Sequence, residues 1–232
     1  MRNICFIGIF DKLDLLIYLG KILNGLKHNI LIIDVTQNQR AKYVVPTIKP
    51  TKAYITHFEN VDIAVGFENY EEIEKYIGIT EGTKPKYDYA LVNIDKPLSF
   101  SQFNNMNTIK NYFVTSFDLY SIRRGLQTIK GIEKPIKMTK LLFSREISIE
   151  DDYYLNYMSL GYKIIWDENK INFPYNTEDI EVMIENQKNN KIRIKGLSQQ
   201  YKDCLSILVM DMFTNVDITE ITKIMKNIEK EW

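Results

Sequence analysis

Lys12 is the first residue along the chain whose type and spacing suggest a chemical role. An apolar run from Asn3 ends at Gly8, and apolar residues at helical spacing follow Lys12 almost at once. A turn that carries a glycine and a lysine between a strand and a helix is the layout of a phosphate site, because backbone amides and an ammonium group both attract anions. The competing interpretation is that a lone lysine in such a turn is simply solvated.

Polar side chains also follow two later apolar runs. Asp34 ends the run NILIID, while Asn93 and Asp95 lie at the end of YDYALVNID. Ligands of open α/β sheets bind outside the carboxyl ends of the strands, so these residues and Lys12 could together hold a phosphate and Mg²⁺. In the alternative interpretation, Asp34 and Asn93 only hold neighbouring loops together by hydrogen bonds, and Asp14 caps the first helix.

The elements that must position these residues follow from hydrophobic periodicity. The first 35 residues predict a strand, a helix and a second strand, which is a βαβ unit with a parallel pair. Strands and helices continue to alternate, so we expect an α/β fold with a doubly wound, mostly parallel sheet and helices on both faces. No linker divides the chain, which predicts a single domain over residues 1–232 with a C-terminal helix at about 216–232.

Several local predictions are specific enough to be checked. Residues 52–58 and 61–67 predict two short strands that pair. Residues 100–109 predict a helix, and residues 162–167 and 170–175 predict two separate short runs that extend the sheet. Thr177 is expected to cap the helix that follows it.

Composition narrows the function classes. Lysine plus arginine equals aspartate plus glutamate, at 30 each, so no strong overall field attracts nucleic acid. Two histidines and two cysteines speak against a zinc site. The N-terminus lacks a secretory layout and no window is long enough to span a membrane, so we expect a cytoplasmic protein. One local basic patch is a candidate contact for DNA or an acidic partner; it consists of Lys188, Lys191, Arg193 and Lys195.

The order of four segments resembles the ParA/MinD family of P-loop ATPases, of the SIMIBI class, which includes the TadZ/CpaE proteins. NILIIDVTQ resembles the family's second strand, and YDYALVNIDKPLS resembles its Walker B strand. YFVTSFDLYSIRRGLQTIKGI resembles the next strand, turn and helix, while INFPYNTEDIEVMIENQ resembles the late loop and its helix. The likeness runs from Ile4 to about Phe213 and implies a P-loop NTPase-like fold.

The same resemblance marks where the phosphate-binding chemistry is replaced. Against the family pattern KGGxGKTT, Gly8 and Lys12 keep a loop glycine and the loop lysine. Side chains that the pattern does not expect occupy the other positions; they are Ile7, Ile9, Asp11, Leu13 and Asp14. Side chains block the close approach of backbone to phosphate, and the hydroxyl that binds Mg²⁺ is gone.

The other site positions depart in the same direction. Asp34 matches the first acidic residue of the second strand, but Thr36 replaces the second. Asn93 stands at the Walker B aspartate, with Asp95 two residues further along as a substitute. Gly8, Lys12, Asp34, Asn93 and Asp95 thus form a vestigial nucleotide site. The resemblance implies a turn without a well-formed phosphate cradle over residues 8–14.

The expected function is that of a non-catalytic pseudo-ATPase with no catalytic residue, no metal site and no cofactor. It would act as a scaffold or positioning factor in a pilus, secretion, conjugation or partition assembly, with protein partners and, as the family implies, a homodimer. Such partners would also recruit it to a membrane. The alternative is a divergent protein that still binds ATP and Mg²⁺, with weak ATPase activity and nucleotide-dependent dimerisation. A small-molecule transferase on a similar fold is the third hypothesis, although no residue names a substrate.

Overall fold

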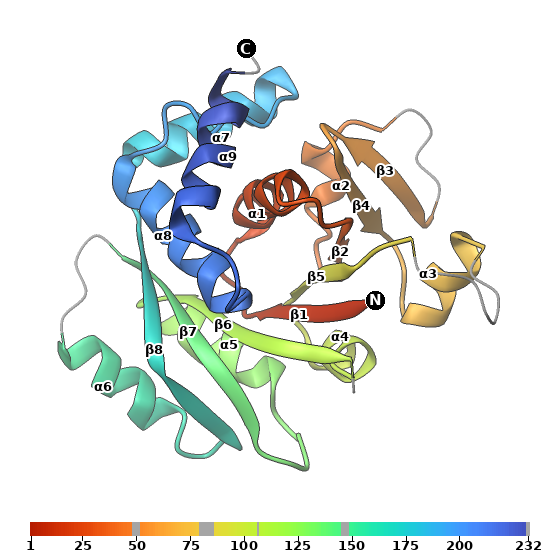
Figure 1. Ribbon diagram of the computed structural model, residues 1–232. Helices are drawn as coiled ribbons and strands as arrows, with labels where there is room; N and C mark the ends of the chain where they lie inside the picture. Colours follow the sequence, from red (N-terminus) through yellow and green to blue (C-terminus); the bar gives the residue numbers. More distant parts are fainter. Residues whose placement is uncertain (48–51, 79–85, 106, 145–148, 231–232) are drawn as a thin grey trace.

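Eight strands form one sheet in the computed structural model, which describes residues 1–47, 52–78, 86–105, 107–144 and 149–230 (Figure 1). Their order across the sheet is β3-β4-β2-β5-β1-β6-β7-β8. The strands are β1 (Arg2–Ile7), β2 (Ile30–Asp34), β3 (Tyr54–Phe58), β4 (Val61–Val65), β5 (Tyr89–Ile94), β6 (Thr108–Ser116), β7 (Ile136–Ser144) and β8 (Ile164–Pro174).

Every neighbouring pair in the sheet is parallel except β3 and β4, which form an antiparallel hairpin at one edge. The predicted pairing of residues 52–58 with 61–67 is therefore confirmed. β1 lies in the middle of the sheet between β5 and β6, and its alternate residues enter different cores. Ile4 and Phe6 join one hydrophobic cluster, while Cys5 and Ile7 join the other. A strand buried on both faces reads as a continuous apolar run, which is how residues 3–8 read.

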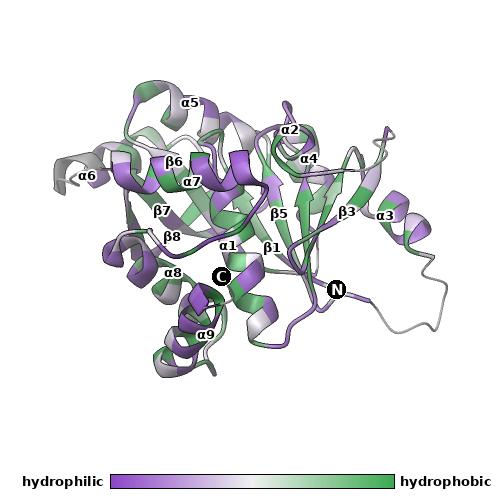
Figure 2. Ribbon diagram, turned by 90° about the horizontal axis from the view of Figure 1, so that it is seen from above, coloured by the Kyte–Doolittle hydropathy of each residue, from purple (hydrophilic) through white to green (hydrophobic). Residues whose placement is uncertain are grey.

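Helices cover both faces of the sheet, as Figure 2 shows with its hydrophobic strands between amphipathic helices. α1, α8 and α9 pack on one face, and α3 to α6 lie on the other. The predicted doubly wound α/β fold is confirmed. The helices are α1 (Leu13–Gly25), α2 (Ala41–Val44), α3 (Tyr70–Tyr76), α4 (Pro97–Phe103), α5 (Leu119–Thr128), α6 (Ile149–Met158), α7 (Thr177–Asn189), α8 (Gln199–Met212) and α9 (Ile218–Lys230).

Three local predictions differ from the structure in detail. The helix expected over 100–109 begins earlier, at Pro97, and the chain is already in β6 from Thr108. A proline in the first turn of a helix loses no hydrogen bond, so it favours a start there. Residues 162–167 and 170–175 do extend the sheet, but as one strand, because β8 runs without interruption from Ile164 to Pro174 and pairs with β7. α7 is capped by Asn176, whose side chain accepts from the Asp179 amide, and not by Thr177.

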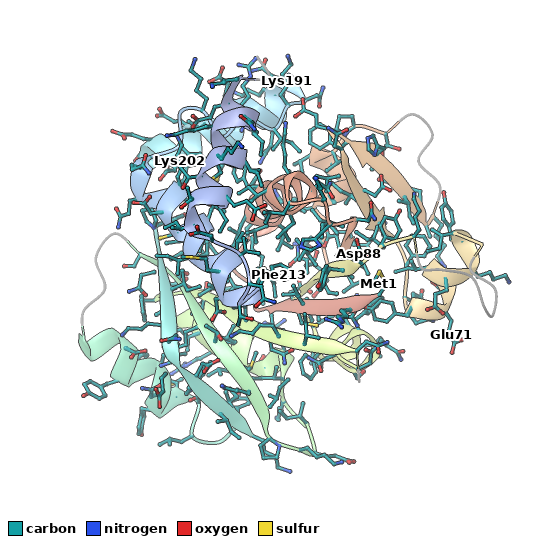
Figure 3. The ribbon with its side chains drawn as sticks, in the orientation of Figure 1. Met1, Glu71, Asp88, Lys191, Lys202 and Phe213 are labelled. Atoms are coloured by element: carbon teal, nitrogen blue, oxygen red, sulfur yellow. The ribbon has the colours of Figure 1, made fainter. Side chains whose placement is uncertain are left out.

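The last helix packs on the first. Ile221, Met225 and Ile228 of α9 are buried, and a Cβ built on Gly25 of α1 would come within 2.5 Å of Ile224. Lys202 of α8, labelled in Figure 3, pairs with Glu229 of α9 at 2.7 Å. The predicted C-terminal helix is present from Ile218, and the end of its predicted range, 231–232, lies outside the described residues. Within the part that the structure describes, no helix has the length and apolar character to cross a bilayer.

Candidate functional site

The turn between β1 and α1 runs from Gly8 to Lys12, at the carboxyl edge of the middle strand. Gly8 has φ +135, a conformation that glycine adopts readily and other residues rarely. A Cβ at this position would lie 2.2 Å from the carbonyl oxygen of Val114 in β6. The amide of Gly8 donates to Ile94 O of β5 at 3.0 Å. The glycine is therefore required by strand packing, whether or not any phosphate binds.

Lys12 is turned into the loop and away from solvent. Its side chain is only 3% exposed, and Nζ donates to Gly8 O at 2.6 Å and to Phe10 O at 3.4 Å. Burial lowers the pKa of Lys12 to about 8, against the attraction of Asp95 and Asp34, which raises it. The interpretation of Lys12 as a solvated lysine is wrong, because the ammonium group closes the loop on itself.

The buried ammonium group of Lys12 predicts a pH-dependent stability. Its pKa is lower in the folded chain than the ordinary value of 10.5, so the unfolded chain holds the extra proton between the two values. The stability contributed by this group therefore rises with pH from about 8 to 10.5. Between pH 7 and 9.5 the unaltered chain should gain about 2 kcal/mol of unfolding free energy relative to Lys12→Met.

Urea denaturation of both chains at the two pH values measures this difference. Lys75→Met, on the exposed side of α3, is the matched control and should keep the pH response of the unaltered chain. If Lys12→Met responds to pH as the unaltered chain does, Lys12 is not buried as a charged group.

The two residues after Lys12 serve packing and contacts between elements. Leu13 is fully buried in the core beneath the sheet. Both carboxylate oxygens of Asp14 accept from Gln187 Nε2 of α7, at 2.9 and 3.0 Å, and burial raises the pKa of Asp14. The expectation that Asp14 caps α1 is wrong. Asp11 lies one residue before the cap position, and its Oδ1 accepts from the Leu13 amide at 3.2 Å.

Asp34 and Asn93 hold loops together, as one of the two interpretations predicted. Asp34 Oδ1 accepts from Thr36 Oγ1 at 2.6 Å, and Oδ2 accepts from the Ala41 amide at 3.0 Å. Asn93 Nδ2 lies 3.4 Å from Asp34 Oδ1. Asn93 Oδ1 is buried and makes no hydrogen bond to any residue that the structure describes. This oxygen at the wall of the site can therefore still accept a hydrogen bond.

Asp95 lies at the edge of the same region. Its Oδ1 accepts from the Gln37 amide at 2.8 Å, and burial raises its pKa despite that hydrogen bond and the nearby charge of Lys12. The five residues predicted as a vestigial site are thus brought together. Four of them line one cavity of about 330 Å³; they are Gly8, Lys12, Asn93 and Asp95. Asp34 lies just behind Asn93 and Thr36.

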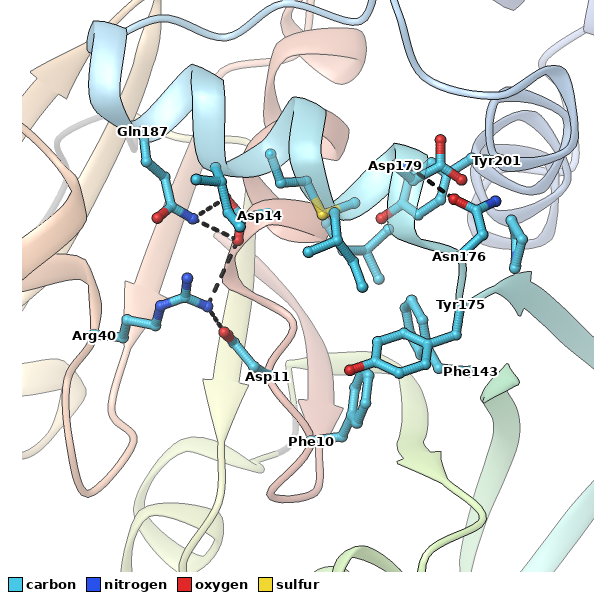
Figure 4. A pocket seen from close by; sticks show the side chains of 15 residues that line it. Phe10, Asp11, Asp14, Arg40, Phe143, Tyr175, Asn176, Asp179, Gln187 and Tyr201 are labelled. Atoms are coloured by element: carbon cyan, nitrogen blue, oxygen red, sulfur yellow. Dashed lines mark hydrogen bonds and ion pairs between the residues drawn. The ribbon is translucent and has the colours of Figure 1, made fainter. Parts of the chain in front are cut away.

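Arg40 is the site residue that the sequence interpretation missed. Its guanidinium group pairs with Asp11 and lies 3.6 Å from Asp14 Oδ2 (Figure 4). It therefore links the loop after β2 to the turn after β1 and to the start of α1. Sequence spacing offered no signal for it, because an arginine four residues past Thr36 pairs with Asp11 only through the sheet topology.

Phe10 fixes the turn from the other side. Its ring stacks on Phe143 of β7 with centroids 4.7 Å apart and meets Tyr175 edge-on at 5.7 Å (Figure 4). Phe143 in turn stacks on Phe173 of β8. Such contacts add to area burial and hold the loop backbone against the strand ends. The turn is anchored by an aromatic side chain and by an ion pair.

The basic patch lies apart from this cavity. Lys188 closes the last turn of α7, and the other members follow that helix; Lys188 and Lys195 are exposed, while Lys191 and Arg193 are half-buried. No member of the patch lines the cavity beside Lys12. Among the residues described, no group of three histidine, cysteine or acidic side chains is arranged to hold a metal ion.

Comparison with known proteins places the fold. No family model matches the chain, and neither does any curated protein. Among solved structures, a ParA family ATPase from Chlorobium tepidum TLS is similar with a TM-score of 0.58 at 15% identity, over 92% of this chain and 98% of that one.

Two further structures show the same likeness. One is a putative plasmid partition protein from Borrelia burgdorferi B31 bound to AMPPNP, with a TM-score of 0.58 at 10% identity over 92% and 99% of the two chains. The other is the MinC:MinD cell division protein complex of Aquifex aeolicus. Its TM-score is 0.57 at 14% identity, over 94% of this chain and 98% of that one. Identities this low establish a shared fold and nothing finer.

Proposed function

We propose that this chain, which has the fold of the ParA and MinD ATPases, is a non-catalytic member of that fold and serves as a scaffold or positioning factor. Its site would bind ATP·Mg²⁺ weakly or not at all, and its partners would be proteins of a larger assembly such as a pilus, secretion, conjugation or partition system. We place it in the cytoplasm, with recruitment to a membrane through those partners.

The observation that carries this proposal is that both cations of the site are already engaged by the chain itself. Lys12 bonds to two loop carbonyls, and Arg40 pairs with Asp11. Asp11 and Asp95 line the cavity, and Asp34 lies beside it. A triphosphate needs free donors and a net positive cradle. A triphosphate entering here would have to break these contacts and face carboxylates.

A protein-contact role is supported by apolar side chains at the carboxyl edge of the sheet. They stand on the loops and helices that follow the strands, where ligands and partners reach such folds. Isolated exposed apolar residues are ordinary, but several on one edge are typical of an interface. Three of them are Tyr43, exposed at 83%, Leu98 at 66% and Tyr120 at 66%. We propose a homodimer or a protein partner at this edge, and DNA at the basic patch as the less favoured contact.

The alternative function is that of a divergent ATP-binding protein with weak ATPase activity. Gly8 and Lys12 remain at the turn, and Asn93 Oδ1 still has capacity to accept a hydrogen bond. A similar structure was solved with AMPPNP. In this case Lys12 would leave the loop carbonyls and bind a phosphate group. The chain would then dimerise when nucleotide binds.

Calorimetric titration with ATP and Mg²⁺ separates the two functions. We expect no binding tighter than about 1 mM, which corresponds to roughly −4 kcal/mol. Light scattering on the same samples should give a mass that ATP does not change. Micromolar, magnesium-dependent binding that Lys12→Ala abolishes would overturn the proposal in favour of the alternative.

A further inference from the structure

A second cavity lies on the other side of the Arg40–Asp11 ion pair, between α7 and the turn after β1 (Figure 4). Phe10, Asp11 and Arg40 line both cavities and form the wall between them. Its volume is about 270 Å³. A cavity of about 150 Å³ can bind benzene, so this one has room for a ligand with one ring and a short chain.

One end of this cavity is apolar. Phe10 and Tyr175 meet edge-on and form an aromatic wall (Figure 4), and Met183 and Ile184 of α7 add apolar lining. Tyr175 is 45% exposed and Ile184 is 43% exposed, so the rim is open to solvent at these two residues. A concave, largely apolar space with a small number of convergent polar groups is the usual form of a small-ligand site.

The other end carries an incompletely neutralised carboxylate. Asp14 has a side chain 17% exposed, and its close hydrogen bonds come from Gln187, which is a neutral amide. Arg40 lies 3.6 Å away and makes its closest contact with Asp11 instead. A third carboxylate, Asp179, is buried and accepts from the amide and hydroxyl of Ser198. The cavity lining described thus holds three carboxylates and one cationic side chain, Arg40.

From this geometry we propose that the cavity binds an organic cation: an amine or guanidine on a short apolar or aromatic body. The cationic head would bind Asp14 and neutralise its carboxylate charge. The body would pack between the aromatic wall and α7. An anion is disfavoured, because it would have to take Arg40 from Asp11 and leave that carboxylate unpaired. A neutral ligand would bury its body but leave Asp14 as it is. This inference goes beyond the proposed function, and ATP binding does not enter it.

Three probes of nearly equal size and different charge test the proposal by NMR titration of the whole chain. They are 2-phenylethylamine, 2-phenylethanol and phenylacetate. We expect the amine to bind about tenfold more tightly than the alcohol, as a charge-assisted contact allows, and the acid to bind more weakly than both. Shifts should map to Phe10, Tyr175 and α7.

Variants assign the preference to its residues. Asp14→Asn keeps the size of the side chain and should reduce the preference for the amine to less than about threefold. Asp203→Asn is the matched control, since Asp203 also accepts from a glutamine amide, at 2.8 Å, but on the exposed surface of α8. It should leave the preference unchanged. Ile184→Trp, at an exposed position, should fill the cavity and weaken the binding of the amine and the alcohol alike.

Three results would overturn the proposal. They are equal affinity for amine and alcohol, a tenfold preference that survives in Asp14→Asn, or the absence of any shift with the amine at millimolar concentration. Circular dichroism on each variant establishes that it is folded before its titration is interpreted.

Discussion

Replacing Gly8 by alanine is expected to cost about 3–5 kcal/mol of unfolding free energy, enough to unfold a chain of ordinary stability. Two causes add. The backbone has φ +135, and the new Cβ would meet the Val114 carbonyl at 2.2 Å, where backbone atoms cannot move aside cheaply. Urea denaturation measures the loss of unfolding free energy. If the variant does not fold, the effect appears as a fall in soluble yield.

Gly131→Ala is the matched control for Gly8→Ala. Gly131 also has a positive φ, +88, but nothing lies within 4 Å of the position of its Cβ. It should cost about 1–2 kcal/mol, from backbone strain alone. Equal losses in the two variants would show that the contact between β1 and β6 at Gly8 is not tight.

Replacing Leu13 by threonine is expected to cost about 2–4 kcal/mol and to restore no ATP binding. The change returns the hydroxyl that the ParA/MinD pattern places there for Mg²⁺. In this chain the side chain is fully buried in the core, so the hydroxyl would be desolvated and the lost volume would leave a cavity. Denaturation gives the stability, and ATP calorimetry on the folded variant gives the binding.

Leu98→Thr provides the comparison, because Leu98 is 66% exposed on α4. Exposed substitutions of this kind usually change stability by no more than about 0.5 kcal/mol. A gain of magnesium-dependent ATP binding in Leu13→Thr would contradict our view that this position now belongs to the core.

Much of the fold could be predicted from the sequence, because periodicity reports burial. The run ILII within NILIIDV is apolar and belongs to β2, which is buried on both faces. β8 was misread because its middle, Asp167 to Lys170, is polar. On this edge strand residues 168–170 are exposed and Asp167 pairs with Lys110 and Lys137, so the polar stretch does not interrupt the strand. Asn176 and not Thr177 caps α7, because asparagine has the stronger preference for the N-cap position.

The candidate site could be predicted only in part. Strand ends pointed to Lys12, Asp34, Asn93 and Asp95, since the carboxyl edge of a parallel sheet gathers them. The direction of the Lys12 side chain was not readable, because nothing in the sequence distinguishes an ammonium that faces solvent from one that bonds to its own loop. The pairing of Arg40 with Asp11 needs β1 and β2 in the same sheet with β5 between them, which is a property of topology.

The packing of α9 on α1 has a consequence for how the chain is completed during synthesis. Gly25 and Ile224 touch although they are roughly 200 residues apart, so this face of α1 has no cover until synthesis has passed α9. A nascent chain that has already built its sheet would still expose apolar residues of α1. Premature termination before α9 should therefore yield an aggregation-prone product, and chaperones should engage the nascent chain until α9 has been made.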